Sequence, residues 1–150
     1  MISKACRYGI RAVVYLASRY GETAKSSFAE ISREVDAPEA YTAKILQILT
    51  KSGIISSIKG PNGGFYMERL QIDQAVINIV DTIDGLDVFY ECGLGLKQCS
   101  ASRPCPMHDQ YKMARETLLD SFSRTTIEQL ARRVKEGSSF VRNLAIPGVG

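Results

Sequence analysis

The chain has 150 residues and a mass of 16.5 kDa, the size of one domain or of one small domain with an appendage. Hydrophobic residues make up 45% and charged residues 23%, which permits a buried core and excludes collagen, a largely disordered chain and a coiled-coil rod. No apolar run approaches the roughly 18 residues that a bilayer span needs. Because Arg7 and Arg11 also interrupt any signal-peptide core, we expect a cytoplasmic protein without membrane contact.

The charges are unevenly distributed, although the net charge is only +3. Residues 1–70 carry ten bases and six acids, whereas residues 71–150 carry nine bases and ten acids. Residues 40–67 contain three lysines and no acid. A polyanion would prefer this stretch, although three lysines are also compatible with an ordinary solvated patch.

Apolar residues at helical spacing predict a first helix over residues 3–20, ended by Gly21. Ser27 and Glu30 form a capping-box pattern, in which the serine accepts from a helical amide and the glutamate reaches back. The short helix that they open is followed by a second helix from Pro38 to about Ser52. Its apolar face is expected to hold Tyr41, Ile45, Ile48 and Leu49, while Glu39, Thr42, Ala43, Gln47 and Thr50 point outward.

Two short helices separated by a turn of about three residues are typical of a helix-turn-helix. β-Branched residues over 54–59, turn residues over 60–64 and the run 65–67 predict a β-hairpin directly after it. A hairpin in this position is a wing. The predicted fold class is therefore mainly α with a small β-wing: a winged helix-turn-helix DNA-binding domain plus a C-terminal dimerisation helix.

We divide the chain into a winged helix-turn-helix region over 1–85, a cysteine-rich cluster-binding loop over 86–108, dimerisation helices over 109–136 and a flexible tail over 137–150. Within the first region, apolar spacing predicts one further helix over 72–84, closed by Gly85. A helix is expected over 109–123, and a second capping box at residues 125–128 opens the last one.

The helix that begins at Pro38 has the polar character of a DNA-recognition helix. Thr42 and Gln47 are short polar groups suited to base edges, while Lys44 and Lys51 suit phosphates. Lys59 and the turn after it suit the minor groove or the backbone. The alternative is that the winged helix serves as a protein-interaction module. The candidate DNA contacts are Ser27, Tyr41, Thr42, Lys44, Gln47, Lys59, Gly60, Pro61 and Asn62.

Three of the four cysteines fall in one glycine-containing loop, with the spacing Cys92-x6-Cys99-x5-Cys105-x2-His108. This is a poor disulfide framework and a better metal site, to which His108 adds a nitrogen donor. Zinc knuckles use tighter spacing, whereas an iron–sulfur cluster has a larger core that suits wider spacing. Both a 2Fe–2S and a 4Fe–4S cluster are compatible with the four donors, and the alternative is a thiol redox or zinc switch. Cys6 lies on the apolar stripe of the first helix, so a buried core thiol is the stronger interpretation. The alternative is that Cys6 serves as a ligand for a site in a partner subunit.

The sequence contains no catalytic constellation, since it has neither a Gly-x-Ser-x-Gly elbow nor a phosphate-binding loop. We therefore expect neither an enzyme nor a small-molecule substrate. An electron-transfer protein is a further alternative, but such a protein has no use for a wing and a recognition helix.

These residues resemble the IscR-like (Rrf-two) family of bacterial winged-helix transcription regulators. The resemblance runs from Ser3-Lys4, with Tyr8 and Ala12, through Leu130. Its most specific parts are the three-cysteine loop and residues 59–65, Lys-Gly-Pro-Asn-Gly-Gly-Phe, where the family commonly shows Arg-Gly-Pro-x-Gly-Gly-Tyr. The resemblance implies a homodimer that binds a palindromic DNA operator and holds an iron–sulfur cluster.

By position, Cys92, Cys99 and Cys105 match the family's cluster cysteines, and His108 matches the histidine ligand of the IscR branch. Tyr41, Lys44 and Lys59 fall where family members contact DNA. Two departures stand out: six residues separate the first two cysteines, one more than in the IscR and NsrR branches, and Ala43 replaces an acidic residue that tunes operator choice. Position 8, which is Tyr, cannot supply the carboxylate ligand of NsrR-like proteins, and this favours His108 as the fourth ligand.

Overall fold

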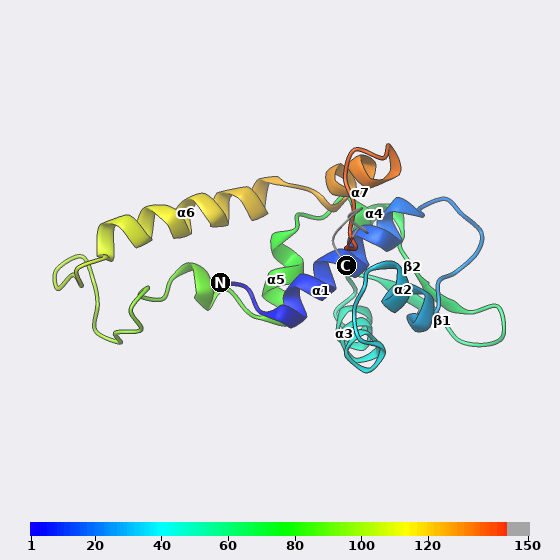
Figure 1. Cartoon of the computed structure of the whole chain (residues 1–150), viewed down its shortest axis with the longest axis horizontal. Helices are drawn as coiled ribbons and strands as arrows, with labels where there is room; N and C mark the ends of the chain where they lie inside the picture. The colour runs from blue at the N-terminus through cyan, green and yellow to red at the C-terminus, as the bar shows by residue number, and fades with distance from the viewer. Residues whose placement is uncertain (144–150) are drawn as a thin grey trace, which may run out of the picture.

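The computed structural model describes residues 1–143 and is mainly helical, with one two-stranded antiparallel sheet (Figure 1). The predicted fold class is confirmed in this respect. The elements in chain order are α1 (Lys4–Ser18), α2 (Phe28–Glu34), α3 (Glu39–Lys51), β1 (Ser56–Ile58), β2 (Gly64–Tyr66), α4 (Arg69–Ile72), α5 (Ile77–Ile83), the 3-10 helix η1 (Asp87–Phe89), α6 (His108–Arg124) and α7 (Ile127–Lys135). None of the helices over these described residues is long and apolar enough to cross a bilayer.

Helix α1 is the central element of the core, because it contacts α2, α3, α5, α7 and β2. Ser3 caps it, its hydroxyl accepting a hydrogen bond of 3.0 Å from the Cys6 amide. The buried stripe of α1 includes Val13 and Leu16, which pack with residues of α2, α3 and α7 in one cluster. Burying one face of α1 against several elements at once gives the winged domain a single core.

The wing follows α3 directly, as predicted. Strands β1 and β2 pair with Ser57 opposite Phe65. Phe65 also exchanges two backbone hydrogen bonds with Ser26, of 2.8 and 3.0 Å, so the segment before α2 holds the base of the wing. At Gly64 the backbone has φ +142°, and a Cβ there would lie 2.7 Å from the Ser26 carbonyl oxygen. Glycine is therefore required at this close approach.

The capping box predicted for α2 is only half right. Ser27 accepts from the Glu30 amide at 3.2 Å, but the Glu30 carboxylate does not reach back to the cap. It accepts instead from the Tyr15 hydroxyl at 2.8 Å and pairs with Arg19. The interactions of the Glu30 carboxylate with Tyr15 and Arg19 are stronger than a hydrogen bond from the Ser27 amide would be, because the carboxylate is charged and Arg19 carries the opposite charge. They connect α2 to α1.

The buried face of α3 differs from the predicted one. The inward stripe holds Thr42, Ile45, Leu46 and Leu49, whereas Tyr41, which we expected in the core, is 48% exposed. The prediction that Thr42 points outward was wrong, since Thr42 is only 2% exposed. Its hydroxyl donates to the Pro38 carbonyl at 2.9 Å, and this bond lets a polar side chain be buried.

The single helix predicted over residues 72–84 is interrupted. Helix α4 ends at Ile72 and α5 begins at Ile77, with an extended bridge between Ala75 and Thr126 in the gap. The Val76 amide donates to the Thr125 carbonyl, and the Ile127 amide donates to the Gln74 carbonyl, both at 2.9 Å. Pairing with the segment before α7 therefore replaces helical hydrogen bonds here.

Helix α6 extends away from the winged domain, and the cysteine-rich loop forms its far end (Figure 1). No residue of α6 is buried, although Leu118, Leu119 and Phe122 pack against a small cluster that contains Cys6, Val80 and Phe89. The wing and the cysteine-rich loop lie at opposite ends of the molecule (Figure 1). The flexible tail predicted over 137–150 falls, from residue 144 on, outside the described residues.

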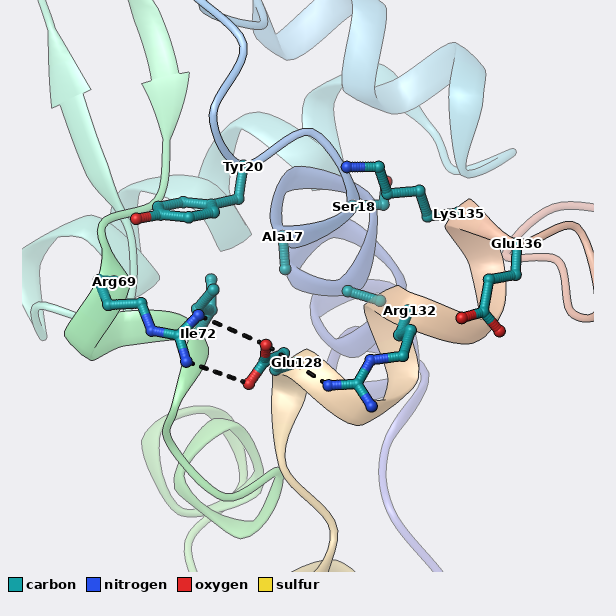
Figure 2. Close-up of a pocket in the computed structure, with 10 residues that line it drawn as sticks. Ala17, Ser18, Tyr20, Arg69, Ile72, Glu128, Arg132, Lys135 and Glu136 are labelled. Carbon is teal, nitrogen blue, oxygen red and sulfur yellow. Dashed lines mark hydrogen bonds and ion pairs between the residues drawn. The ribbon is translucent and has the colours of Figure 1, made fainter.

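Helix α7 returns to the core and packs on α1 and α4. Its capping box is formed by Thr126 and Gln129, one residue later than predicted. Glu128 pairs with Arg69 of α4 at 3.4 Å and with Arg132 at 3.6 Å, across a cleft floored by Ala17 and Ile72 (Figure 2). These pairs are exposed and long, so we attribute the attachment of α7 mainly to the fully buried Ile127.

The substitution Ile127→Ala should therefore destabilise the domain by about 2–5 kcal/mol, because it removes a fully buried side chain and leaves a cavity. The matched substitution Glu128→Gln should cost less than about 1 kcal/mol, because exposed ion pairs contribute little. Urea unfolding followed by circular dichroism measures both values. Equal losses for the two variants would contradict this assignment.

Burial, and then the nearby Asp84 carboxylate, raise the pKa of the Cys6 thiol to about 12. Because only the thiolate reacts with alkylating agents, Cys6 should stay unlabelled by iodoacetamide in the native protein at pH 8 and become labelled in denaturant. Peptide mass spectrometry reads out each cysteine separately. Rapid native labelling of Cys6 would show that the thiol is not held in the core.

Candidate metal centre and nucleic-acid interface

The three loop cysteines converge at the N-terminal end of α6. Their Sγ atoms all lie within 4.8 Å of one another, and those of Cys92 and Cys105 are 3.6 Å apart. Cys99 Sγ lies 3.2 Å from Nδ1 of His108, which is the first residue of α6. The structure thus brings together all four donors expected from the sequence, around a cavity of about 70 Å³.

Loop backbone amides direct two of these sulfurs. The Leu94 amide donates to Cys92 Sγ at 3.4 Å, and the Cys105 amide donates to Cys99 Sγ at 3.3 Å. Hydrogen bonds from the Leu96 and Leu94 amides lower the pKa of Cys92 to about 7, whereas burial raises the pKa of Cys105. Since a metal binds the thiolate, Cys92 is more readily prepared for it at neutral pH than Cys105 is.

Helix α6 contributes three side chains to this cavity at helical spacing, His108, Tyr111 and Arg115. The Tyr111 ring packs on Gly93, where a Cβ would lie 2.6 Å from the ring. The Arg115 guanidinium stacks on the same ring at 5.5 Å and donates to the Glu91 carbonyl. The sequence analysis did not identify Tyr111 and Arg115 as site residues. The helical spacing His108-x2-Tyr111-x3-Arg115 is the signal that indicates them.

The chemistry of this donor set is that of a soft or borderline metal. Three thiols and one imidazole are ligands of zinc and of iron–sulfur clusters. A tetrahedral zinc site with bonds of about 2.3 Å sets its sulfurs about 3.8 Å apart, close to the separation of Cys92 and Cys105. Two cysteines bound to the same iron of a cluster would be equally close, whereas cysteines bound to different irons lie further apart.

The candidate nucleic-acid interface lies on α3. Its outward face carries Lys44, Gln47 and Lys51, all exposed, together with Tyr41. Thr42 is turned into the core and cannot meet a base edge. Ser27 is exposed, but its hydroxyl also caps α2.

Aromatic and basic side chains of α1 border this face, which the sequence interpretation missed. Tyr8 contacts Tyr41 edge-on, with ring centroids 5.8 Å apart. The Arg11 guanidinium lies 5.0 Å from the Tyr8 ring centroid and donates to the Asp36 carbonyl at 2.9 Å. Asp36 belongs to the turn between α2 and α3 and has φ +53°. Arg11 therefore links α1 to the turn that positions α3.

The wing presents its turn to solvent. Lys59, Gly60, Pro61 and Asn62 are all exposed. Lys25, which the sequence interpretation did not single out, lies 4.2 Å from the Tyr66 ring centroid and adds a cation beside β2. Because the residue spacing within a wing does not specify which earlier loop packs on it, only the folded chain brings Lys25 to this place.

The chain matches known proteins over most of its length. Residues 2–133 match the family Rrf2, described as an iron-dependent transcriptional regulator. A protein of Aquifex aeolicus (strain VF5), described as a candidate HTH-type transcriptional regulator, is 29% identical over 132 residues, which cover 87% of this chain and 90% of that protein.

Solved structures share the fold. CymR (YrzC), the global cysteine regulator of B. subtilis, superposes with a TM-score of 0.72 at 23% identity, over 88% of this chain and 96% of that one. IscR of T. potens superposes with a TM-score of 0.71 at 20% identity, over 93% and 91% of the two chains. A family match that covers nearly the whole described chain agrees with the wing and the three-cysteine loop, and it shows that this protein belongs to the Rrf2 family of transcriptional regulators.

Proposed function

We propose that this protein is a homodimeric, sequence-specific DNA-binding transcription regulator whose operator affinity is controlled by an iron–sulfur cluster. The observation that carries the proposal is the convergence of Cys92, Cys99, Cys105 and His108 on one cavity in a winged-helix chain. The family description as iron-dependent supports iron as the metal. The protein would act on duplex DNA without a catalytic step.

The donor set fits such a cluster. Cys92, Cys99, Cys105 and His108 would hold it, and the cluster would supply a group that is gained, lost or changed in redox state. Arg115, which lines the cavity, also has a buried nitrogen without a hydrogen-bond partner among the described residues, its Nε. A cationic donor next to a thiolate site is suited to an anionic group. The residues between Cys92 and Cys105 are mostly exposed and include Gly93 and Gly95, so this loop can widen around a larger core.

A zinc or thiol redox switch is the second candidate. It is favoured by the mutual closeness of the three sulfurs, which all lie within 4.8 Å of one another as around a single tetrahedral ion. CymR, a cysteine regulator, shares the fold, so this fold is not restricted to one signal. Metal and sulfide analysis distinguishes the two candidates.

We propose dimerisation through α6. This helix has no buried residue, yet it carries Leu118, Leu119 and Phe122 on one side and Met113 on another. Phe122 also lines an apolar hollow of about 200 Å³ with Val76 and Leu130. A second copy of α6 would cover such surfaces, and a palindromic operator would match the two-fold symmetry.

The cysteine-rich loop would communicate with DNA through packed elements. Phe89, three residues before Cys92, packs with Cys6 of α1 and Val80 of α5. These two helices in turn contact α3. A change in the loop that moves Phe89 would therefore shift the population of the DNA-binding arrangement.

Protein purified without oxygen should contain iron and sulfide. It should also absorb light between about 320 and 460 nm, as expected of a cysteine-ligated cluster. The Cys92→Ala variant should lose the iron, the sulfide and the absorption. It should bind the operator with an affinity different from that of the loaded protein. Fluorescence anisotropy on an operator selected from random duplexes measures the affinities. Equal affinities for loaded, stripped and Cys92→Ala protein would defeat the proposed control, and zinc without sulfide would favour the second candidate.

Replacing Lys44 by Ala should weaken binding to specific and random duplexes alike and should reduce the slope of log K against log salt by about one, as expected for a lost phosphate contact. Replacing Gln47 by Ala should instead reduce discrimination between operator and mismatched duplexes, by about 1–3 kcal/mol at one base pair. Lys135→Ala, an exposed lysine of α7 away from α3, is the matched control and should change neither. Identical effects of all three would argue against α3 as the recognition helix.

A further inference from the structure

We propose that Arg115 is the charge partner of the metal group, and that it stabilises the excess negative charge which the three thiolates bring to the cavity. The inference rests on the proposed function, because it requires Cys92, Cys99, Cys105 and His108 to hold a metal. It adds a residue that is not itself a ligand and that acts through its charge.

The geometry places Arg115 at the cavity wall. It lines the same cavity as the four donors, one side of its guanidinium donates to the Glu91 carbonyl, and its plane stacks on Tyr111. Another nitrogen of the same group, Nε, is buried and has no hydrogen-bond partner among the described residues. An unpartnered buried donor is costly, and an anionic group within its reach would reduce this cost.

The charge balance gives the direction of the effect. Three thiols that bind a divalent ion as thiolates change the site to a net charge of −1, since the imidazole stays neutral. A permanent positive charge at the wall favours this change. The same reasoning applies to an iron–sulfur core held by three thiolates, whose added electron would also be favoured.

Other cations near the loop are less suited to this role. Lys97 and Arg103 border the outer side of Cys99 and Cys105, but both are exposed to solvent, which screens them. Lys112 lies on α6 one turn before Arg115, is exposed and pairs with Glu116 at 3.9 Å. Arg115 is the permanent charge among the described residues that line the cavity of the four donors.

The test measures the affinity of the reduced, metal-free, full-length protein for Co²⁺ alone. Co²⁺ is titrated under argon at pH 7.5, and binding is read from the thiolate-to-cobalt absorption. Arg115→Gln and Arg115→Met should each weaken Co²⁺ binding about tenfold, at the lower end of the effect of residues that support metal ligands. Arg115→Lys should remain within about threefold of wild type, because it keeps the charge. Lys112→Gln removes the same charge from the exposed side of the same helix and should bind as wild type does.

Thermal melts of the metal-free variants check that each one is folded. Because both Arg115→Gln and Arg115→Met remove the charge, the test remains possible if one of them misfolds. Wild-type affinity in both neutral variants would overturn the inference while leaving the proposed function in place. A loss in Arg115→Lys as large as in Arg115→Gln would also overturn it, because Arg115 would then act only by holding Glu91 and Tyr111. If the wild-type protein itself binds no Co²⁺, the proposed metal site fails and this inference fails with it.

Discussion

The close approach of α1 to α3 and α5 at Gly9 is the contact on which the winged domain depends. A Cβ at this position would clash with the Ile83 side chain of α5 and would lie 3.4 Å from Cγ2 of Ile45 on α3. Glycine thus lets the three helices meet without displacing Ile83, whose side chain would have to move to accept a Cβ here. The position of α3 relative to the wing follows from this contact, because α1 also packs on β2. A DNA-binding face is useful only if it is held rigidly, and the contact at Gly9 supplies that rigidity.

The same helix connects the DNA-binding end to the cysteine-rich end. One side of α1 belongs to the main core, while Cys6 belongs to the smaller cluster with Val80 and Phe89. That cluster also receives Phe122 of α6, whose ring centroid lies 6.1 Å from that of Phe89. A displacement at either end of α6 must therefore be accommodated by side chains that also hold α1. Close-packed side chains respond to such displacements by changing between discrete arrangements, which is how a local event becomes a change in domain position.

The two functional regions are built on different physical principles. The proposed DNA interface consists of exposed side chains on rigid elements, so its affinity would depend on salt and on the orientation of α3. The proposed metal centre consists of partly buried donors on a loop that one end of α6 anchors, so its affinity would depend on the pKa values of the thiols and on the charge around them. Solved structures of CymR and IscR share this fold, and a fold by itself does not specify a signal.

The sequence by itself determined the helix-turn-helix, the wing and the set of metal donors, because these depend on local chemistry: helical periodicity, turn residues and the rarity of cysteine and histidine. Tertiary structure decided which side of α3 faces inward. Thr42 and Tyr41 are neighbours, and only the packing of α3 on α1, α2 and α5 determines that the threonine is buried and the tyrosine exposed. Contacts between distant segments also decided the interruption of the helix at Ala75, where Thr126 supplies an alternative backbone partner. In the same way, the Glu30 carboxylate accepts a hydrogen bond from Tyr15 of another helix and does not cap its own helix. Arg115 lines the candidate metal cavity for the same reason, since its contacts with Glu91 and Tyr111 hold it against the loop.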